Sequence, residues 1–174
     1  MAVILGKTIS KSGIASDYLD AIQFQPGGID LSLRDVYKFK GSGVIDFWNK
    51  NRRLAPTEKV AFSKKEKLKL NKGCYKIVYN EYIKIPTGCI GLAFPRSSLL
   101  RCGAFIHCAV WDPGYEGRSE SLLVVANENG IWLEKNARLV QLILLKLEKS
   151  AEQGYQGVYM KENRAKGKGV GAKC

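Results

Sequence analysis

The segment CYKIVYNEYIKIPTGCIGLAF, residues 74–94, decides the fold. Residues 74–79, 82–85 and 89–94 are short runs rich in Tyr, Ile and Val, a composition typical of β-strands. The Pro-Thr-Gly at 86–88 is a turn signal, because proline fixes φ and glycine supplies positive φ. Strands that follow one another this closely indicate a β-rich fold.

The same pattern extends on both sides of this segment. Short strands separated by Gly or Pro turns at a spacing of ~8–12 residues predict an all-β sandwich or barrel. Residues 40–59 carry no regular pattern, and Ser16 before residues 17–22 predicts a minor N-terminal helix with a serine cap. The further predicted strands are 29–33, 67–70, 104–110, 121–126, 131–133 and 139–147, with turns at 112–114 and 127–130.

The C-terminal half carries three specific expectations. The Asn-Glu-Asn-Gly at 127–130 predicts a hairpin-like turn. The long apolar run 139–147 should be buried on both faces or against another subunit. Arg138 and Gln141 would point to opposite faces if their strand is regular, because side chains alternate along a strand.

The net charge of +12 is unevenly placed along the 174 residues. Residues 50–72 have a surplus of seven basic residues and residues 161–174 a surplus of four. A basic surface attracts polyanions, so a nucleic-acid-binding β-barrel is one alternative. Two solvated surface segments are the favoured interpretation, since the charge does not interleave with aromatic residues across the domain.

Composition excludes several classes of protein. The length suits one domain, and no apolar run approaches the ~20 residues that a membrane span needs. The N-terminus lacks the features of a signal peptide, and five irregularly spaced cysteines suit reduced thiols in the cytoplasm. One histidine and no CxxC argue against structural zinc. His107 and Cys108 are neighbours on opposite strand faces, which disfavours thiol catalysis.

Two short motifs could carry chemistry. Pro-Arg-Ser-Ser-Leu at 95–99 offers two hydroxyls and the planar guanidinium of Arg96, which suits phosphate, although Arg-Ser-Ser could simply begin a helix. Trp-Asp-Pro-Gly-Tyr-Glu-Gly at 111–117 places acids and an aromatic on a tight turn, although Asp112 could simply cap that turn.

In order and spacing, these motifs resemble the dUTPase and dCTP deaminase superfamily, and within it the archaeal-type dUTPases most closely. The resemblance covers roughly residues 20–160. It rests on Gln-Pro-Gly-Gly-Ile-Asp-Leu at 25–31, the motifs at 95–99 and 111–117, Ala-Arg-Leu-Val-Gln-Leu at 137–142, and Gly-Tyr-Gln-Gly-Val-Tyr at 154–159. The third motif has the Asp-Pro-Gly-aromatic form of the deaminase branch.

The resemblance implies a β-clip or distorted jelly-roll subunit in a homotrimer, with active sites between subunits. It implies dUTP as substrate with Mg²⁺, held through phosphates and water and not directly by the protein. A single β-domain over residues 1–153 would carry the nucleotide site, and residues 154–174 would form a flexible basic arm. Membrane association is not implied, and nucleic-acid binding is disfavoured.

The resemblance also implies residue roles. Asp112 would orient and deprotonate the attacking water, and Tyr115 would pack against the deoxyribose. Residues 154–170 would fold over the nucleotide. The substrate-binding set would be Arg96, Ser97, Ser98, Tyr115 and Gln141, with Asp30 and Arg138 in support and Tyr155, Tyr159 and Arg164 on the C-terminal lid.

The reaction depends on one strand. On the strand after the Asp-Pro-Gly turn, the deaminase branch uses a glutamate to move protons. Counted forward from Gly117 this position is Leu122, and counted back from Asn127 it is Val124. Neither is acidic, so we expect hydrolysis of dUTP at the α-phosphate. Glu120 shares that strand face if the strand is regular, so dCTP deaminase and a bifunctional enzyme stay open as alternatives. Backbone groups of 106–110 are the expected base-reading site.

Overall fold

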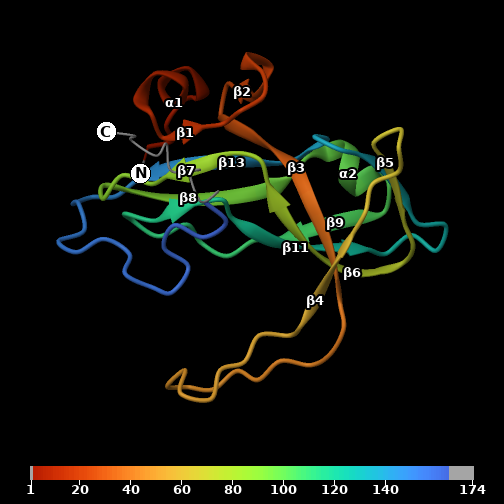
Figure 1. Cartoon of the computed structure of the whole chain (residues 1–174). Helices are drawn as coiled ribbons and strands as arrows, with labels where there is room; N and C mark the ends of the chain where they lie inside the picture. Colours follow the sequence, from red (N-terminus) through yellow and green to blue (C-terminus); the bar gives the residue numbers. More distant parts are fainter. Residues whose placement is uncertain (1, 165–174) are drawn as a thin grey trace, which may run out of the picture.

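The structure, a computed structural model, describes residues 2–164. It is built mainly of short antiparallel strands, as predicted, with two short α-helices and one 3-10 turn (Figure 1). The elements are α1 (Gly6–Ser12), β1 (Ala15–Ser16), η1 (Ala21–Gln23), β2 (Phe24–Gln25), β3 (Gly28–Phe39), β4 (Thr57–Val60), β5 (Lys67–Leu70), β6 (Gly73–Tyr79), β7 (Tyr82–Lys84), β8 (Cys89–Pro95), α2 (Ser97–Arg101), β9 (Ala104–His107), β10 (Glu116–Gly117), β11 (Glu120–Val125), β12 (Ile131–Glu134) and β13 (Arg138–Lys146).

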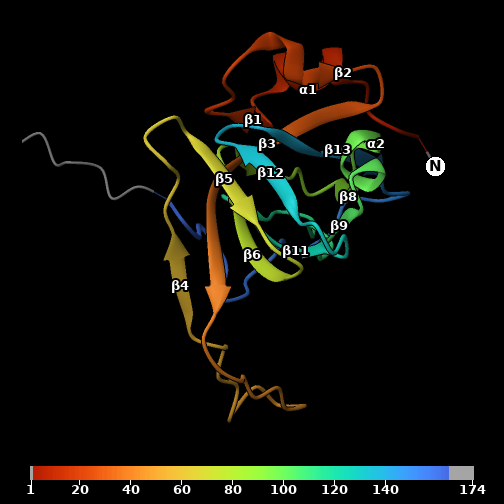
Figure 2. The same ribbon diagram turned by 90° about the vertical axis from the view of Figure 1, so that its right-hand side faces the viewer.

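The long strand β3 joins the two halves of the main sheet. Its first residues pair with β13, and its residues from Leu33 onward pair with β6, with a register shift between Leu33 and Asp35. The resulting order is β8-β13-β3-β6-β11-β9. A bulge bends a strand and increases its twist, so β3 can change direction and carry the sheet around the core. Figure 2 shows how far β3 runs from the main body.

The core lies inside this curved sheet. Ile29, Leu31 and Leu33 of β3 are fully buried and point inward, while Asp30 and Ser32 on the opposite face are buried under the N-terminal segment. The apolar run of β13 alternates between buried and half-buried residues. Its inner face is therefore core, and its other face is only partly covered by this chain.

Two local predictions are wrong. Ser16 does not cap a helix and lies in β1. The helical pieces are α1 and η1, and η1 is capped by Asp20, whose carboxylate accepts from Ile22 N. The turn at 127–130 exists, since Gly130 N donates to Asn127 O. It does not close a hairpin, because β12 pairs with β5 and not with β11. β12 instead pairs with residues 67–70, whose side chains alternate between exposed and buried.

Residues 40–56 form a long arm between β3 and β4, at the bottom of Figure 1. The absence of a regular pattern is confirmed for most of it, apart from a bridge between Val44 and Arg53. The segment 57–60 is a strand, because it pairs with residues 36–39 of β3. Phe47 and Trp48 lie exposed at the arm, 85% and 73% accessible.

The fully buried Glu81 ties β7 to β3. Its carboxylate accepts hydrogen bonds from Gln23 Nε2 and Ser32 Oγ, both at 2.6 Å, and from Ser32 N at 2.9 Å. Burial raises the pKa of Glu81, and the three donors oppose that effect. Every donor around this carboxylate would lose its partner if the side chain were removed.

We expect Glu81→Ala to lower the free energy of unfolding by about 1–3 kcal/mol, because buried donors are left unpaired. Urea denaturation followed by circular dichroism would measure it. Glu134→Ala is the control, since Glu134 only pairs with Lys67 at the surface. Equal, small effects of both substitutions would contradict the role of Glu81.

Candidate functional site: two pockets on one chain

The first pocket lies beside the carboxylate of Asp30, which is 1% exposed and contacts three predicted residues. Arg96 Nε lies 3.3 Å from Asp30 Oδ2, and Arg138 Nη1 lies 3.2 Å from the same oxygen. Gln141 Nε2 donates to Asp30 Oδ1 at 3.4 Å. Ser97 lines the same pocket of about 280 Å³. These side chains come from β3, β13 and the β8–α2 junction.

A bulge in β13 brings Arg138 and Gln141 together. The register of β13 against β3 shifts between Arg138 and Val140. One extra residue in a strand reverses the alternation of side chains beyond it. Both side chains therefore reach Asp30. The strand is not regular here, so the condition under which they would point to opposite faces is not met.

The electrostatics of this pocket suit an anion. Burial raises the pKa of Asp30, while the charges of Arg96 and Arg138 and the Gln141 amide oppose the rise. Arg96 is the N-cap residue of α2, which begins at Ser97, and no side chain caps this helix. The motif does begin a helix, yet Arg96 and Ser97 still line the pocket. Ser97 and Ser98 are exposed at this end.

The second pocket, of about 250 Å³, contains Asp112 and Tyr115. Asp112 is exposed on the turn that Tyr115 N closes by donating to Asp112 O at 3.0 Å. Within residues 2–164 its carboxylate makes no hydrogen bond to protein, so it does not cap the turn. A free carboxylate at the edge of a pocket can accept a proton from water.

Tyr115 is fixed by hydrogen bonds at the wall of this pocket and is 6% exposed. Its hydroxyl lies 3.2 Å from Ser119 Oγ and donates to Glu162 Oε1 at 2.7 Å. Trp111 Nε1 donates to the same serine oxygen. Burial raises the pKa of Tyr115 far above its ordinary value, so the phenol stays protonated and acts as a donor.

The C-terminal segment 154–164 crosses the Asp-Pro-Gly turn. Tyr155 N donates to Pro113 O at 2.7 Å, and the Tyr155 ring stands edge-on to Tyr115 with 5.8 Å between centroids. Gly114 has φ 80°, and a Cβ there would lie 2.7 Å from Gly154 Cα. The two glycines therefore allow the backbones to touch. The rest of the expected arm, 165–174, lies outside the described residues.

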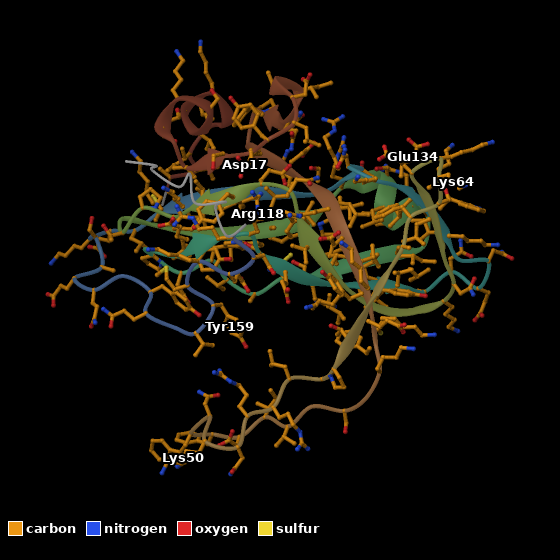
Figure 3. All side chains as sticks on the ribbon, in the orientation of Figure 1. Asp17, Lys50, Lys64, Arg118, Glu134 and Tyr159 are labelled. Carbon is orange, nitrogen blue, oxygen red and sulfur yellow. The ribbon has the colours of Figure 1, made fainter. Side chains whose placement is uncertain are left out.

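The other two predicted lid residues lie in the middle and at the end of this segment. Tyr159 faces the arm, with Arg52 Cζ 5.8 Å from its ring centroid. Figure 3 shows Tyr159 between the main body and the arm that carries Lys50. Arg164 lies over the ring of Tyr82 at 5.7 Å. Arg118, which forms an ion pair with Asp17, supports the same region (Figure 3).

Strand β11 is regular. Its residues pair in unbroken register with β6, from Glu120 opposite Val78 to Val125 opposite Gly73. Glu120, Leu122 and Val124 therefore share the half-buried face, as the alternation predicted. Glu120 Oε1 accepts from Lys76 Nζ at 3.0 Å and from Asn163 Nδ2 at 3.2 Å. No shift brings it to the positions of Leu122 or Val124.

Sequence reasoning missed Lys76, Ser119 and Glu162. Lys76 and Ser119 looked like ordinary strand and turn residues. Glu162 had one signal, because it is the single acid among the basic residues of 161–174. The two pockets share no lining residue. The first is held together by arginines and the second contains three acids, Asp112, Glu120 and Glu162.

A model of the family described as dCTP deaminase-like matches residues 4–147. The chain belongs to this family. The expected superfamily is thereby confirmed. An Archaeoglobus fulgidus protein named probable deoxyuridine 5'-triphosphate nucleotidohydrolase is 46% identical over 168 residues, covering 94% of this chain and 98% of its own.

Two further comparisons agree. A Methanocaldococcus jannaschii protein named deoxyuridine 5'-triphosphate nucleotidohydrolase is 42% identical over 158 residues, covering 90% of this chain and 98% of its own. The solved 2'-deoxycytidine 5'-triphosphate deaminase from Agrobacterium tumefaciens matches with TM-score 0.64 and 21% identity. That match covers 82% of this chain and 48% of that chain. It supports the fold alone, and the expected β-clip or jelly-roll class of this family is confirmed.

Other features of this family member concern ions and thiols. Residues 2–164 contain no group of three His, Cys, Asp or Glu side chains arranged to hold a metal ion. Within the same range, no helix is long and apolar enough to cross a bilayer. Cys74, Cys89, Cys102 and Cys108 are free thiols. His107 is exposed, and its ring packs edge-on against Phe105.

We expect Gly114→Ala to detach the C-terminal segment, because a Cβ at Gly114 meets the backbone of Gly154. The measurement is limited proteolysis with mass spectrometry, and cleavage within 154–164 should become faster. Gly13→Ala is the matched control. Gly13 also has positive φ, 71°, but nothing lies within 4 Å of its Cβ position. Equal protection in both variants would contradict the packing of the segment on the turn.

Proposed function

We propose that this protein is a dUTP diphosphatase, which hydrolyses dUTP at the α-phosphate to give dUMP and pyrophosphate. The observation that carries the proposal is the near full-length similarity, at 42–46% identity, to archaeal proteins named deoxyuridine 5'-triphosphate nucleotidohydrolases. The two pockets give this reaction a physical basis, since one suits phosphate and the other presents a free carboxylate.

The first pocket would bind the phosphates. Arg96, Ser97, Ser98 and Gln141 supply the donors, and guanidinium and hydroxyl groups match phosphate oxygens. Asp30 holds Arg96 and Gln141 in place, and Arg138 shares the same carboxylate. Donors fixed before the substrate arrives stabilise negative charge without reorganising during the reaction.

The second pocket would hold the attacking water and the sugar. Asp112 orients and deprotonates the water, which then attacks the α-phosphorus and releases pyrophosphate. Tyr115 lies three residues along the same turn, and its ring edge would pack against the deoxyribose, where a 2′-hydroxyl would not fit. Backbone groups of 106–110 would read the base, since Ala109 and Val110 line this pocket.

Magnesium would enter as part of the substrate. The donor set of the first pocket, with two arginines around Asp30, fits phosphate oxygens and not a cation. No dedicated metal cage lies within residues 2–164. A Mg²⁺ held by the phosphates and water supplies charge neutralisation in phosphoryl transfer. The exposed Asp112 is compatible with water-mediated contact to such an ion.

The apolar positions on β11 favour hydrolysis over deamination. A deaminase needs a proton carrier beside the base, and Leu122 and Val124 cannot serve. The alternative, dCTP deaminase or a bifunctional enzyme, would have to use Glu120. That carboxylate is already engaged by Lys76 and Asn163.

A complete site would combine pockets from two copies in a homotrimer. One chain holds the phosphate donors and Asp112 in separate pockets. Phe94 and Leu100, beside the first pocket, and Phe105 on β9 are 57%, 54% and 38% exposed. A second copy would cover such apolar side chains.

The C-terminal segment would act as a lid over the nucleotide. Tyr155 and Tyr159 line the second pocket, and Arg164 lies beside it over Tyr82. The basic residues beyond would meet the phosphates. The free thiols suit a cytoplasmic setting, where cysteines stay reduced.

The first test is product analysis by anion exchange after incubation with Mg²⁺ and dUTP or dCTP. We expect dUMP and pyrophosphate from dUTP, and no change in dCTP. Asp112→Asn should lower kcat by ~10²–10⁴-fold, since it removes the base and keeps the shape. Nucleotide binding, measured by calorimetry, should persist.

Three results would oppose this assignment. Conversion of dCTP to dUTP or dUMP would establish deamination, and Glu120→Gln would be the next variant. A normal kcat of the Asp112→Asn variant would contradict the proposed role of Asp112 as the base. Strongly salt-dependent binding of oligonucleotides without turnover would favour the nucleic-acid-binding barrel.

The shared site predicts complementation between two inactive variants. Arg96→Ala and Asp112→Asn should each be inactive alone. Co-refolded at equal amounts, they should regain activity in about a quarter of sites, because some sites receive both intact halves. The measurement is dUTP turnover of the mixture. Asp112→Asn mixed with Asp112→Ala is the control, and activity no higher in the first mixture than in this control would show that each chain carries a whole site.

A further inference from the structure

Glu162 occupies a position in the second pocket that its sequence neighbours do not share. It is half-buried, while Lys161 and Asn163 on either side are exposed. Its backbone forms a bridge with Gly117, and Arg118 N donates to Glu162 O at 3.0 Å. The segment is therefore registered against the end of β10, and this register directs the Glu162 side chain into the pocket.

The side chain of Glu162 ends at the hydroxyl of Tyr115. The hydrogen bond from Tyr115 to Glu162 Oε1 is 2.7 Å, and the Ser119 hydroxyl holds the other side of the phenol at 3.2 Å. Gly117 leaves room for this pair, because a Cβ there would lie 2.7 Å from the Tyr115 oxygen and 3.1 Å from Glu162 Cγ. The absence of a side chain at 117 therefore allows the hydrogen bond between Tyr115 and Glu162 to form.

The charged groups around Glu162 leave Tyr115 as the main partner of its carboxylate. Burial and the neighbouring Glu120 raise the pKa of Glu162, while Tyr115 and Lys76 lower it. Lys76 is already paired with Glu120 at 3.0 Å. The phenol is therefore the main direct partner of this carboxylate among the described residues.

We propose that Glu162 is a positioning residue for Tyr115, through which the C-terminal segment takes part in selecting deoxyribose over ribose. This inference rests on the proposed function, in which the Tyr115 ring contacts the sugar. A ring held between Ser119 and Glu162 cannot move aside to admit a 2′-hydroxyl. Without the carboxylate, the phenol has one anchor and the sugar site is looser.

The test is a double-mutant cycle in the full-length enzyme with kcat/KM for dUTP and UTP as readouts. Glu162→Ala and Tyr115→Phe should each lower the preference for dUTP over UTP by about tenfold, the worth of one hydrogen bond to a charged group. The double variant should be no worse than either single one, because both remove the same contact. Glu162→Gln should restore most of the preference, since its amide oxygen still accepts. Glu152→Ala, which removes an exposed acid just before this segment, should leave the preference unchanged.

Each other result has a definite meaning. If Glu162→Ala lowers kcat/KM for both nucleotides equally, the residue only anchors the tail and the inference is overturned. Additive effects of Glu162→Ala and Tyr115→Phe would overturn it as well, while dUTP turnover by the wild type would leave the proposed function intact. Absence of dUTP turnover in the wild-type enzyme would remove the proposed function and, with it, this inference.

Discussion

The buried carboxylate of Asp30 is the interaction on which the candidate site depends. It lies at 1% exposure on a strand whose other face is core, and two guanidinium groups and one amide converge on it. Burying a carboxylate is costly unless it is paired and hydrogen-bonded. The pairing fixes Arg96, at the start of α2, and Arg138 and Gln141, both on β13. The contacts that stabilise the buried carboxylate also hold the guanidinium and amide groups in positions where they can bind an anion.

The two pockets differ in the charged residues that line them. Arg96 lines the first, where Asp30 is paired with Arg96 and Arg138, and the second contains Asp112, Glu120 and Glu162. Three acids would repel the terminal phosphates of a triphosphate, whereas a sugar and a neutral base would not be repelled. A nucleoside triphosphate has the same division between its ends. This match supports the proposed site, in which both pockets take part.

In the proposed function, the side chains of strand β11 favour hydrolysis over deamination. Its register is unbroken, so Leu122 and Val124 stay on the face where a deaminase would carry its acid. Glu120, the first residue of the strand, shares this face, but its carboxylate accepts a hydrogen bond from Lys76. Hydrolysis of the phosphoanhydride bond between the α- and β-phosphates does not need a proton carrier at the base. The fold can therefore serve a hydrolase once that acid is replaced by an apolar residue.

The sequence alone determined the β-rich class, the superfamily and most of the candidate residues, because strand alternation, turn residues and short motifs are local signals. It placed Asp30, Arg96, Asp112 and Tyr115 in motifs without placing them relative to one another. Only the tertiary structure decided that a bulge turns Arg138 and Gln141 toward the same carboxylate, that β12 pairs with β5, and that Glu162 reaches Tyr115. These depend on register and on contacts between residues far apart in the chain, which no local pattern encodes.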